Sequence, residues 1–124
     1  MKVFNNYKSA SRYTKNSILV IGNLDGVHKG HQKIIKSAKD IAKKNNTRLG
    51  ILLFNPHPKK YFESYKNGFL LTDLNSRFNI LKDQKVDYVI VLGFNKNLAN
   101  MLPSDFCNKI LFLGVKMSHV FVGT

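Results

Sequence analysis

Two short runs of apolar residues, at 18–21 and 49–54, stand out in a chain that is otherwise rich in lysine and asparagine. Both runs have the length and the branched side chains of buried β-strands. Between them, apolar residues recur every three or four positions over 30–45, which predicts an amphipathic helix. The residues of this apolar stripe are Ile34, Ile35, Ala38, Ile41 and Ala42. A strand, a helix and a strand at this spacing predict a right-handed βαβ unit with a parallel sheet.

The alternation of helix and strand continues further along the chain. Residues 55–71 form a long connection with two prolines and a glycine, and connections of this length are often functional. Thr72 is a suitable N-cap for a helix that runs through residue 84. The inward face of this helix is expected to carry Leu74, Phe78 and Leu81. A third strand is expected at 87–92.

The two ends of the chain are harder to interpret. Residues 1–17 are polar and basic with weak periodicity, so we expect an extended lead-in with a short edge strand at Val3 and Phe4. Residues 94–101 carry no clear pattern. Pro103 is suited to the first turn of a helix to about residue 112, and 119–122 has the pattern of a fourth strand. The inward residues of that last helix are expected to be Phe106, Ile110 and Leu113.

Composition and charge narrow the class of protein. The chain has 124 residues, 44% of them hydrophobic, which suits one globular domain. The apolar runs are much shorter than a membrane span, and no hydrophobic signal core precedes residue 18, so we expect a cytoplasmic protein. The single cysteine, Cys107, excludes an internal disulfide. It falls on a predicted apolar helix face and is expected to be buried and inert.

The net charge of +13 is distributed unevenly. Residues 1–62 contain 13 Lys+Arg and 2 acidic residues, whereas residues 63–124 contain 7 Lys+Arg and 5 acidic residues. Such a field favours anionic partners, namely nucleotides, phosphates or nucleic acid. The plainer interpretation, that these lysines are simply solvated, carries similar weight.

The connection after the first strand contains the most informative motif, GNLDGVHKGH over residues 22–31. Gly22 ends the strand, and the polar residues that follow it predict a tight turn. His28 and His31 are three residues apart, so they lie on one side of the first turn of the next helix. The free N–H groups of a helix start attract anions, and this combination predicts a phosphate-binding site.

The motif does not fit the two common phosphate loops. No Gly-Lys-Ser/Thr follows the turn, which excludes a P-loop, and the glycine spacing differs from the dinucleotide-binding fingerprint. The His-x-Gly-His core resembles the adenylyl-transferring nucleotidyltransferases. The longer motif resembles the N-terminal FAD synthetase module of bacterial bifunctional riboflavin kinase/FAD synthetases, which usually carries Phe at the Leu24 position. The alternative is an ordinary strand-to-helix turn with two surface histidines.

A second motif, FNPHP at residues 54–58, follows the second strand. Ligands of open parallel sheets bind at the carboxyl ends of the strands, so both motifs are expected at the same edge. Two prolines stiffen the loop, and Phe62 offers a face on which a flat ring could stack. The alternative is a rigid loop with core aromatics. The pattern F-x-P-H-P-x-x-x-F resembles the same family, whose two prolines and phenylalanine line the FMN site.

The resemblance implies a fold and an activity. The fold is a Rossmann-like nucleotidyltransferase α/β fold, a parallel sheet with helices on both faces, over residues 18–124. The activity is FMN adenylyltransferase: ATP and FMN give FAD and diphosphate with Mg²⁺. His28 and His31 are the implied catalytic residues. The implied ATP-binding residues are Gly22, Asn23, Leu24, Asp25 and Gly30. The implied FMN-binding residues are Pro56, His57, Pro58 and Phe62. No dedicated metal ligands are implied, because ATP oxygens and water hold Mg²⁺ well.

Further matches to the family run to the end of the chain. They are Leu71 and Thr72 with Arg77, then Phe94, Leu98, the stretch 103–106 and the final 120–123. The family's later Phe-x-Phe-Gly segment, its Ser/Thr- and Arg-containing motif and its riboflavin kinase domain do not follow. The chain therefore resembles a fold that is incomplete at its C-terminus, and we expect slow turnover or none from it alone.

The sequence is compatible with three functions. The first is an FMN adenylyltransferase, and the second is a fragment of one that binds nucleotide or flavin without turnover. The third is a basic nucleic-acid-binding protein, which only the charge supports. A zinc site built from His28 and His31 has no further evident ligands, and a serine hydrolase is disfavoured because the chain has no nucleophile elbow.

Overall fold

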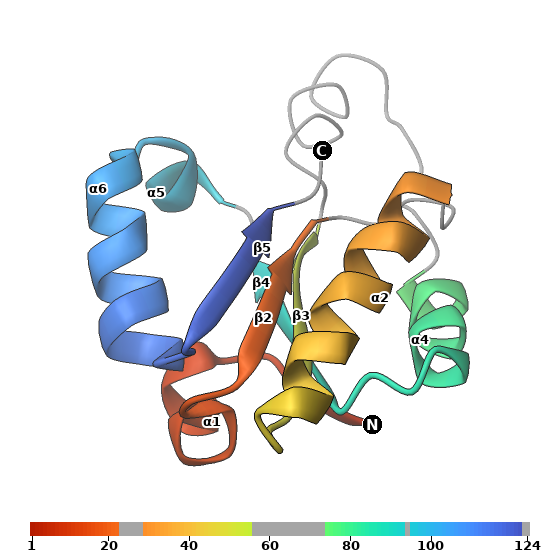
Figure 1. The fold of residues 1–124 in the computed structure, drawn as a ribbon. Helices are drawn as coiled ribbons and strands as arrows, with labels where there is room; N and C mark the ends of the chain where they lie inside the picture. The colour runs from red at the N-terminus through yellow and green to blue at the C-terminus, as the bar shows by residue number, and fades with distance from the viewer. Residues whose placement is uncertain (23–28, 56–73, 94, 123–124) are drawn as a thin grey trace.

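The computed structural model describes residues 1–22, 29–55, 74–93 and 95–122. Five parallel strands form one sheet in the order β1-β4-β3-β2-β5 (Figure 1). Their bounds are β1 Lys2–Phe4, β2 Ile18–Ile21, β3 Leu49–Asn55, β4 Tyr88–Gly93 and β5 His119–Val122. The parallel α/β architecture expected from the βαβ pattern is confirmed.

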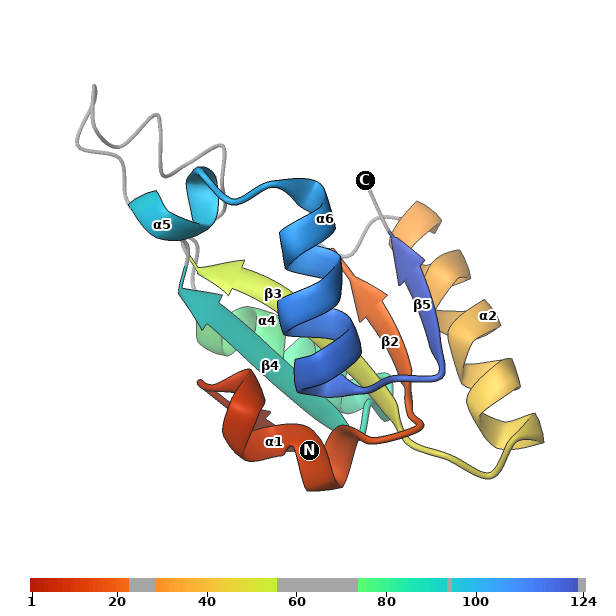
Figure 2. The same cartoon turned by 90° about the vertical axis from the view of Figure 1, so that its left-hand side faces the viewer.

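Helices cover both faces of the sheet, as Figures 1 and 2 show. On one face lie α2 (Lys29–Lys44) and α4 (Leu74–Asp83). On the other lie α1 (Tyr7–Thr14) and the π-helix η1 (Phe106–Val115), which continues the short α6 (Pro103–Asp105). A four-residue helix, α5 (Lys96–Ala99), follows β4. None of the helices in the described ranges is long and apolar enough to cross a bilayer.

The core is two apolar layers separated by the sheet. The α2 stripe packs on one face through Ile35, Ala38 and Ala42, and Ile34 and Ile41 are half-buried at its margin. The other layer joins α1 and η1 to the sheet. Strand β3 lies between β4 and β2 and is buried on both faces from Leu49 to Leu53. The prediction of a doubly buried second strand is therefore confirmed.

The extended lead-in predicted for residues 1–17 is wrong in its second half. The edge strand at Val3 and Phe4 is present, but residues 7–14 form helix α1. Its N-cap is Asn6, whose side chain accepts a hydrogen bond of 2.8 Å from the Lys8 N–H. Ala10 and Thr14, four residues apart, are buried against η1, and the Thr14 hydroxyl donates to the Val115 carbonyl at 2.7 Å. The rest of the inward face consists of the half-buried rings of Tyr7 and Tyr13, and because it carries no aliphatic side chain larger than alanine, the helical period is weak in the sequence.

The helix predicted from Pro103 is present, and Phe106 and Ile110 face the core as predicted, but Leu113 does not. From Phe106 the backbone is a π-helix, in which hydrogen bonds span five residues instead of four. The wider turn adds Leu111 and Val115 to the inward positions, and it leaves Leu113 64% exposed. Cys107 is exposed for the same reason, so the prediction of a buried thiol is also wrong.

Tyr88 of β4 lies directly over Gly50 of the neighbouring strand β3. They are paired in register, and a Cβ placed on Gly50 would lie 1.9 Å from the Tyr88 ring. The Tyr88 hydroxyl is 2.6 Å from the Ser17 hydroxyl, which itself donates to the Thr14 carbonyl at 2.5 Å. Because Ser17 already donates its hydroxyl proton to Thr14, Tyr88 is the donor in the hydrogen bond between the Tyr88 and Ser17 hydroxyls. Burial is the main cause that raises the pKa of Tyr88 to about 12.

Candidate functional site

The strand order reverses between β2 and β5. From β2 the chain adds β3 and then β4 on one side, with α2 and α4 covering one face. It then crosses the other face through α5, α6 and η1 and returns to the opposite side of β2 as β5. Ligands of open α/β sheets bind at the carboxyl ends of the strands where such a reversal occurs. The fold thus marks the end of β2 as the candidate site.

The end of β2 and the start of α2 are the described parts of the first motif. Gly22 is buried, and its N–H donates to the Leu52 carbonyl at 3.2 Å, which continues the pairing of β2 with β3. Gly30 and His31 lie in the first turn of α2, whose first turn contains no acidic residue. The positive end of a 16-residue helix therefore has no carboxylate of its own to neutralise it. Asn23, Leu24, Asp25 and His28, and the His31 side chain, lie outside the described residues.

The carboxyl edge of the sheet has a step beside this point. Ile21, the last residue of β2, pairs with Leu52, whereas β3 continues to Asn55, which pairs with Gly93 of β4. Three residues of strand correspond to about 10 Å. The raised ends of β3 and β4 form a wall next to the low ends of β2 and β5. The second motif leaves from the top of this wall, and Pro56, His57, Pro58 and Phe62 lie outside the described residues.

An apolar hollow of about 270 Å³ lies against the wall. Its lining residues are Phe54, Leu98, Met101, Pro103, Phe106 and Cys107. The rings of Phe54 and Phe106 tilt at 41° with 6.2 Å between their centroids, so both present aromatic surface to the same region. Mostly apolar concavities of this kind suit flat organic ligands.

The sequence patterns did not predict the part of this hollow that residues 94–101 supply. Residues 94–101 were left unassigned, yet α5 and the chain after it supply Leu98 and Met101. The missed signal is Asn95, whose side chain accepts a 2.9 Å hydrogen bond from the Leu98 N–H as an N-cap. Cys107 lines the hollow because the π-helical turn exposes it.

Arg77 of α4, one of the family matches, is 3% exposed, which is rare for an arginine. Within the described ranges, no three or more His, Cys, Asp or Glu side chains are grouped so that they could hold a metal ion. Two polar hollows, lined by residues such as Lys43 and Thr47, lie at the opposite, amino edge of the sheet.

Comparison with known families identifies the fold. A family model described as FAD synthetase matches residues 10–124. The chain belongs to the FAD synthetase family. The resemblance seen in the two motifs is thereby confirmed, and the matched region begins within helix α1.

Several curated relatives of this FAD synthetase family member are named bifunctional riboflavin kinase/FMN adenylyltransferase. The protein of Buchnera aphidicola subsp. Schizaphis graminum is 28% identical over 99% of this chain and 39% of its own length. That of Escherichia coli K12 is 30% identical over 86% of this chain and 34% of its own. The protein of Bacillus subtilis is 32% identical over 86% of this chain and 34% of its own length. The chain spans well under half the length of the curated relatives it matches.

A solved structure supports the architecture of this FAD synthetase family member. A crystal structure described as a macrolide-efflux protein from Streptococcus pneumoniae superposes with a TM-score of 0.81 at 25% identity. The match covers 98% of this chain and 46% of the other. The Rossmann-like α/β fold is therefore shared over almost the whole chain.

Proposed function

We propose that this chain is the FMN adenylyltransferase module of a flavin-cofactor enzyme, joining ATP and FMN into FAD and diphosphate. The observation that carries the proposal is the strand-order reversal, because it directs the connection with the His-x-Gly-His motif to the crevice where open α/β sheets bind ligands. The family match and the names of the relatives support the same reaction. In those relatives the activity is paired with a riboflavin kinase, and a cytoplasmic location belongs to the same proposal.

ATP is proposed to bind where β2 passes into α2. Gly22 and Gly30 allow the backbone to approach the nucleotide, and Asn23, Leu24 and Asp25 shape the turn around it. The uncompensated positive end of α2 attracts the phosphates. His28 and His31 donate hydrogen bonds to phosphate oxygens. The first turn of α2, which includes His31, supports this arrangement, because a helix start aims its free N–H groups at an anion.

FMN is proposed to bind beside the wall formed by β3 and β4. Pro56, His57, Pro58 and Phe62 follow the end of β3, and their rigid, aromatic character suits a flavin ring. The hollow next to Phe54 and Phe106 supports this assignment, because it is an apolar surface with two aromatic rings on which a flavin ring can pack. The flavin phosphate is proposed to reach the nucleotide over the end of β2, on the lower side of the step in the sheet edge.

The proposed reaction needs no covalent enzyme intermediate. An oxygen of the FMN phosphate attacks the α-phosphorus of ATP, and the bond from that phosphorus to the bridging oxygen breaks, releasing diphosphate. Catalysis then consists of alignment and of stabilising the negative charge that develops on the phosphates. His31 supplies a donor for that charge. Mg²⁺ is proposed to arrive with ATP, held by phosphate oxygens and water.

Isothermal titration calorimetry with ATP tests the nucleotide site. His28→Ala/His31→Ala is expected to weaken ATP binding at least about tenfold, the effect of losing roughly 1.4 kcal/mol of hydrogen bonding. His119→Ala is the matched control, because His119 is exposed at the start of β5 and therefore at the opposite end of the strands. Unchanged ATP affinity in a folded double variant would contradict the proposed site.

Chromatographic detection of FAD from FMN, ATP and Mg²⁺ tests the reaction. FAD formation that His31→Ala abolishes and His119→Ala leaves intact supports the transferase. Binding of both ligands without FAD formation identifies this chain as a nucleotide- and flavin-binding fragment. Absence of binding to either ligand contradicts the proposal altogether.

A further inference from the structure

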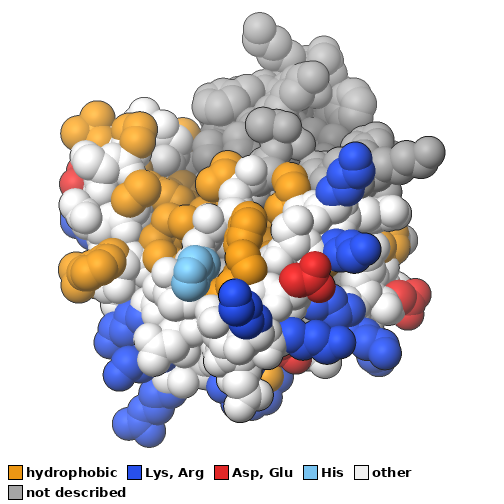
Figure 3. All heavy atoms as spheres, viewed as in Figure 1, with side chains coloured by type: hydrophobic (Ala, Val, Ile, Leu, Met, Phe, Trp, Pro, Cys, Tyr) orange, Lys and Arg blue, Asp and Glu red, His pale blue; other side chains and the backbone are white. Residues whose placement is uncertain are grey.

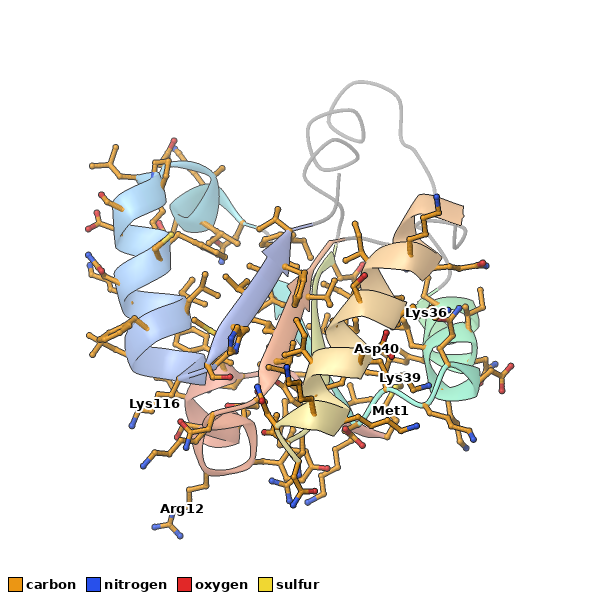
Figure 4. All side chains as sticks on the ribbon, in the orientation of Figure 1. Met1, Arg12, Lys36, Lys39, Asp40 and Lys116 are labelled. Carbon is orange, nitrogen blue, oxygen red and sulfur yellow. The ribbon has the colours of Figure 1, made fainter. Side chains whose placement is uncertain are left out.

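Arg77 is a charged side chain in the interior of the protein. Within the described ranges it is the one charged residue that is buried, with 3% of its surface exposed. Figure 3 shows Lys and Arg side chains on the outside of the molecule, and in Figure 4 Arg12 and Lys36 project into solvent. A guanidinium stays charged in proteins, and burial of a charge is unfavourable unless hydrogen-bond acceptors surround it. The burial of Arg77 therefore indicates a role that depends on its N–H donors.

The position of Arg77 on α4 directs its side chain to the carboxyl edge of the sheet. Helix α4 connects two parallel strands, β3 and β4, so it runs from the carboxyl edge back to the amino edge. Arg77 lies in the half of α4 that is nearer the carboxyl edge. Leu81, one turn later on the same side of the helix, is buried in the core that α4 forms with the sheet. Because helical side chains lean toward the N-terminus of their helix, the Arg77 side chain leads from this core toward the carboxyl ends of β3 and β4.

The carboxyl ends of β3 and β4 are no longer apolar on the face that α4 covers. Leu53 and Val91 belong to the core on that face. Side chains alternate along a strand, so the next residues on the same face are Asn55 and Gly93, which pair in register. Asn55 has a polar side chain, and Gly93 has no side chain that would cover the backbone of β4. This end of the wall therefore offers oxygen acceptors on the side from which Arg77 approaches it.

We propose that Arg77 is a positioning residue for the flavin half of the candidate site. Its N–H donors hold the ends of β3 and β4 from the side of α4, and this support fixes the wall. Phe54 precedes Asn55 and packs on the opposite face of the sheet, where it lines the apolar hollow, and the second motif leaves β3 at the same point. A shift of the wall therefore displaces the surface on which FMN is proposed to bind. The identity of this ligand rests on the proposed function, whereas the support of the wall by Arg77 does not.

Binding of FMN, followed by flavin fluorescence, tests the role of Arg77 in the site. Arg77→Met keeps most of the length of the side chain but removes its donors, and it is expected to weaken FMN binding at least about tenfold. ATP binding is expected to change less than about twofold, because ATP is proposed to bind at the start of α2. Arg77→Lys keeps the charge and N–H donors, so its FMN affinity is expected to stay within about threefold of the parent. Leu81→Val is the matched control, because it trims the same side of α4 without removing a donor, and it is expected to change FMN affinity less than about twofold.

Hydrogen exchange tests the support of the wall without any ligand. In Arg77→Met, the amides of 53–55 and 91–93 are expected to exchange at least about tenfold faster, whereas those of 18–21 exchange as in the parent. If the parent binds no FMN, the proposed function is contradicted, and hydrogen exchange alone decides the role of Arg77. Unchanged exchange at the wall overturns that role, as does an equal loss of FMN affinity in Arg77→Met and Leu81→Val. Arg77→Gln, which is shorter and uncharged, repeats both measurements if Arg77→Met does not fold.

Discussion

Gly50 is a position where an added methyl group has no room, because the Tyr88 ring covers it from the neighbouring strand. Both residues are in the two central strands, so neither can move without disturbing the sheet. The side chain of Tyr88 is also held by its hydrogen bond to Ser17, which ties the start of β2 to the start of β4.

Gly50→Ala is expected to destabilise the protein by about 3 kcal/mol, because overpacking in a closed core forces backbone shifts. Urea unfolding followed by circular dichroism measures the loss. Gly93→Ala is the control, since a Cβ there meets nothing within 4 Å. Equal stability of the two variants would mean that the Tyr88 ring yields to the methyl group.

The ionisation of Tyr88 predicts alkaline unfolding. The pKa of Tyr88 is 10.0 in an unfolded chain and about 12 in the fold, so the folded state holds the proton more strongly. The stability due to this group is complete below pH 10 and is lost as the pH rises from 10 through 12. The two-unit difference corresponds to about 3 kcal/mol. Tyr88→Phe removes this group, so its unfolding free energy is expected to fall less steeply over that range.

At the scale of elements, α1 depends on its cap as well as on its packing. The helix has eight residues; its fully buried members, Ala10 and Thr14, are small, and the rings of Tyr7 and Tyr13 pack half-buried against the core. Short helices of this kind are marginal by themselves, so the cap and the contacts with η1 decide whether α1 forms.

Asn6→Ala is expected to lower the unfolding free energy by about 1 kcal/mol through loss of the N-cap hydrogen bond to Lys8. Asn5→Ala, at the neighbouring exposed asparagine, is the control and is expected to have little effect. Thermal denaturation of both variants gives the comparison. If Asn5→Ala costs as much as Asn6→Ala, the cap is not what stabilises α1.

The elements with strong apolar periods could be predicted from the sequence, and those without it could not. Strands β2, β3 and β5 and helix α2 were predicted within about a residue of their observed bounds, because uniform apolar runs and an unbroken 3.6 period identify them. Helix α1 was missed because its inward face consists of tyrosines, an alanine and a threonine, with no aliphatic stripe. The π-helical turn of η1 could not be predicted, since every residue from 110 to 113 is apolar and the run fits more than one period.

The same limit applies to the candidate site. The two motifs could be found in the sequence because glycine, histidine and proline are informative at fixed spacing. The hollow could not be predicted from the sequence. Met101 lines it because the short helix α5 precedes that residue, and Cys107 lines it because of the wide turn of η1. The side chains of most predicted site residues lie outside the described ranges, so their roles stay predictions.

At the scale of the whole molecule, the charge of +13 raises the question of nucleic acid. We expect binding of single-stranded or duplex DNA to show no sequence preference and to fall by about a thousandfold between 50 and 200 mM salt, as counterion release requires. Fluorescence anisotropy with several labelled oligonucleotides measures this. A complex that is specific and resists salt would favour a nucleic-acid-binding protein over the proposed enzyme.

The position of β1 and α1 has a consequence for folding. Lys2 pairs with Tyr88, and the Thr14 hydroxyl donates to the Val115 carbonyl, so both contacts join residues that are far apart in the sequence. Contacts this distant form slowly, because a long loop must close before they are made. Strand β1 and helix α1 are therefore expected to join the sheet late in folding, after the local β2–α2–β3 unit.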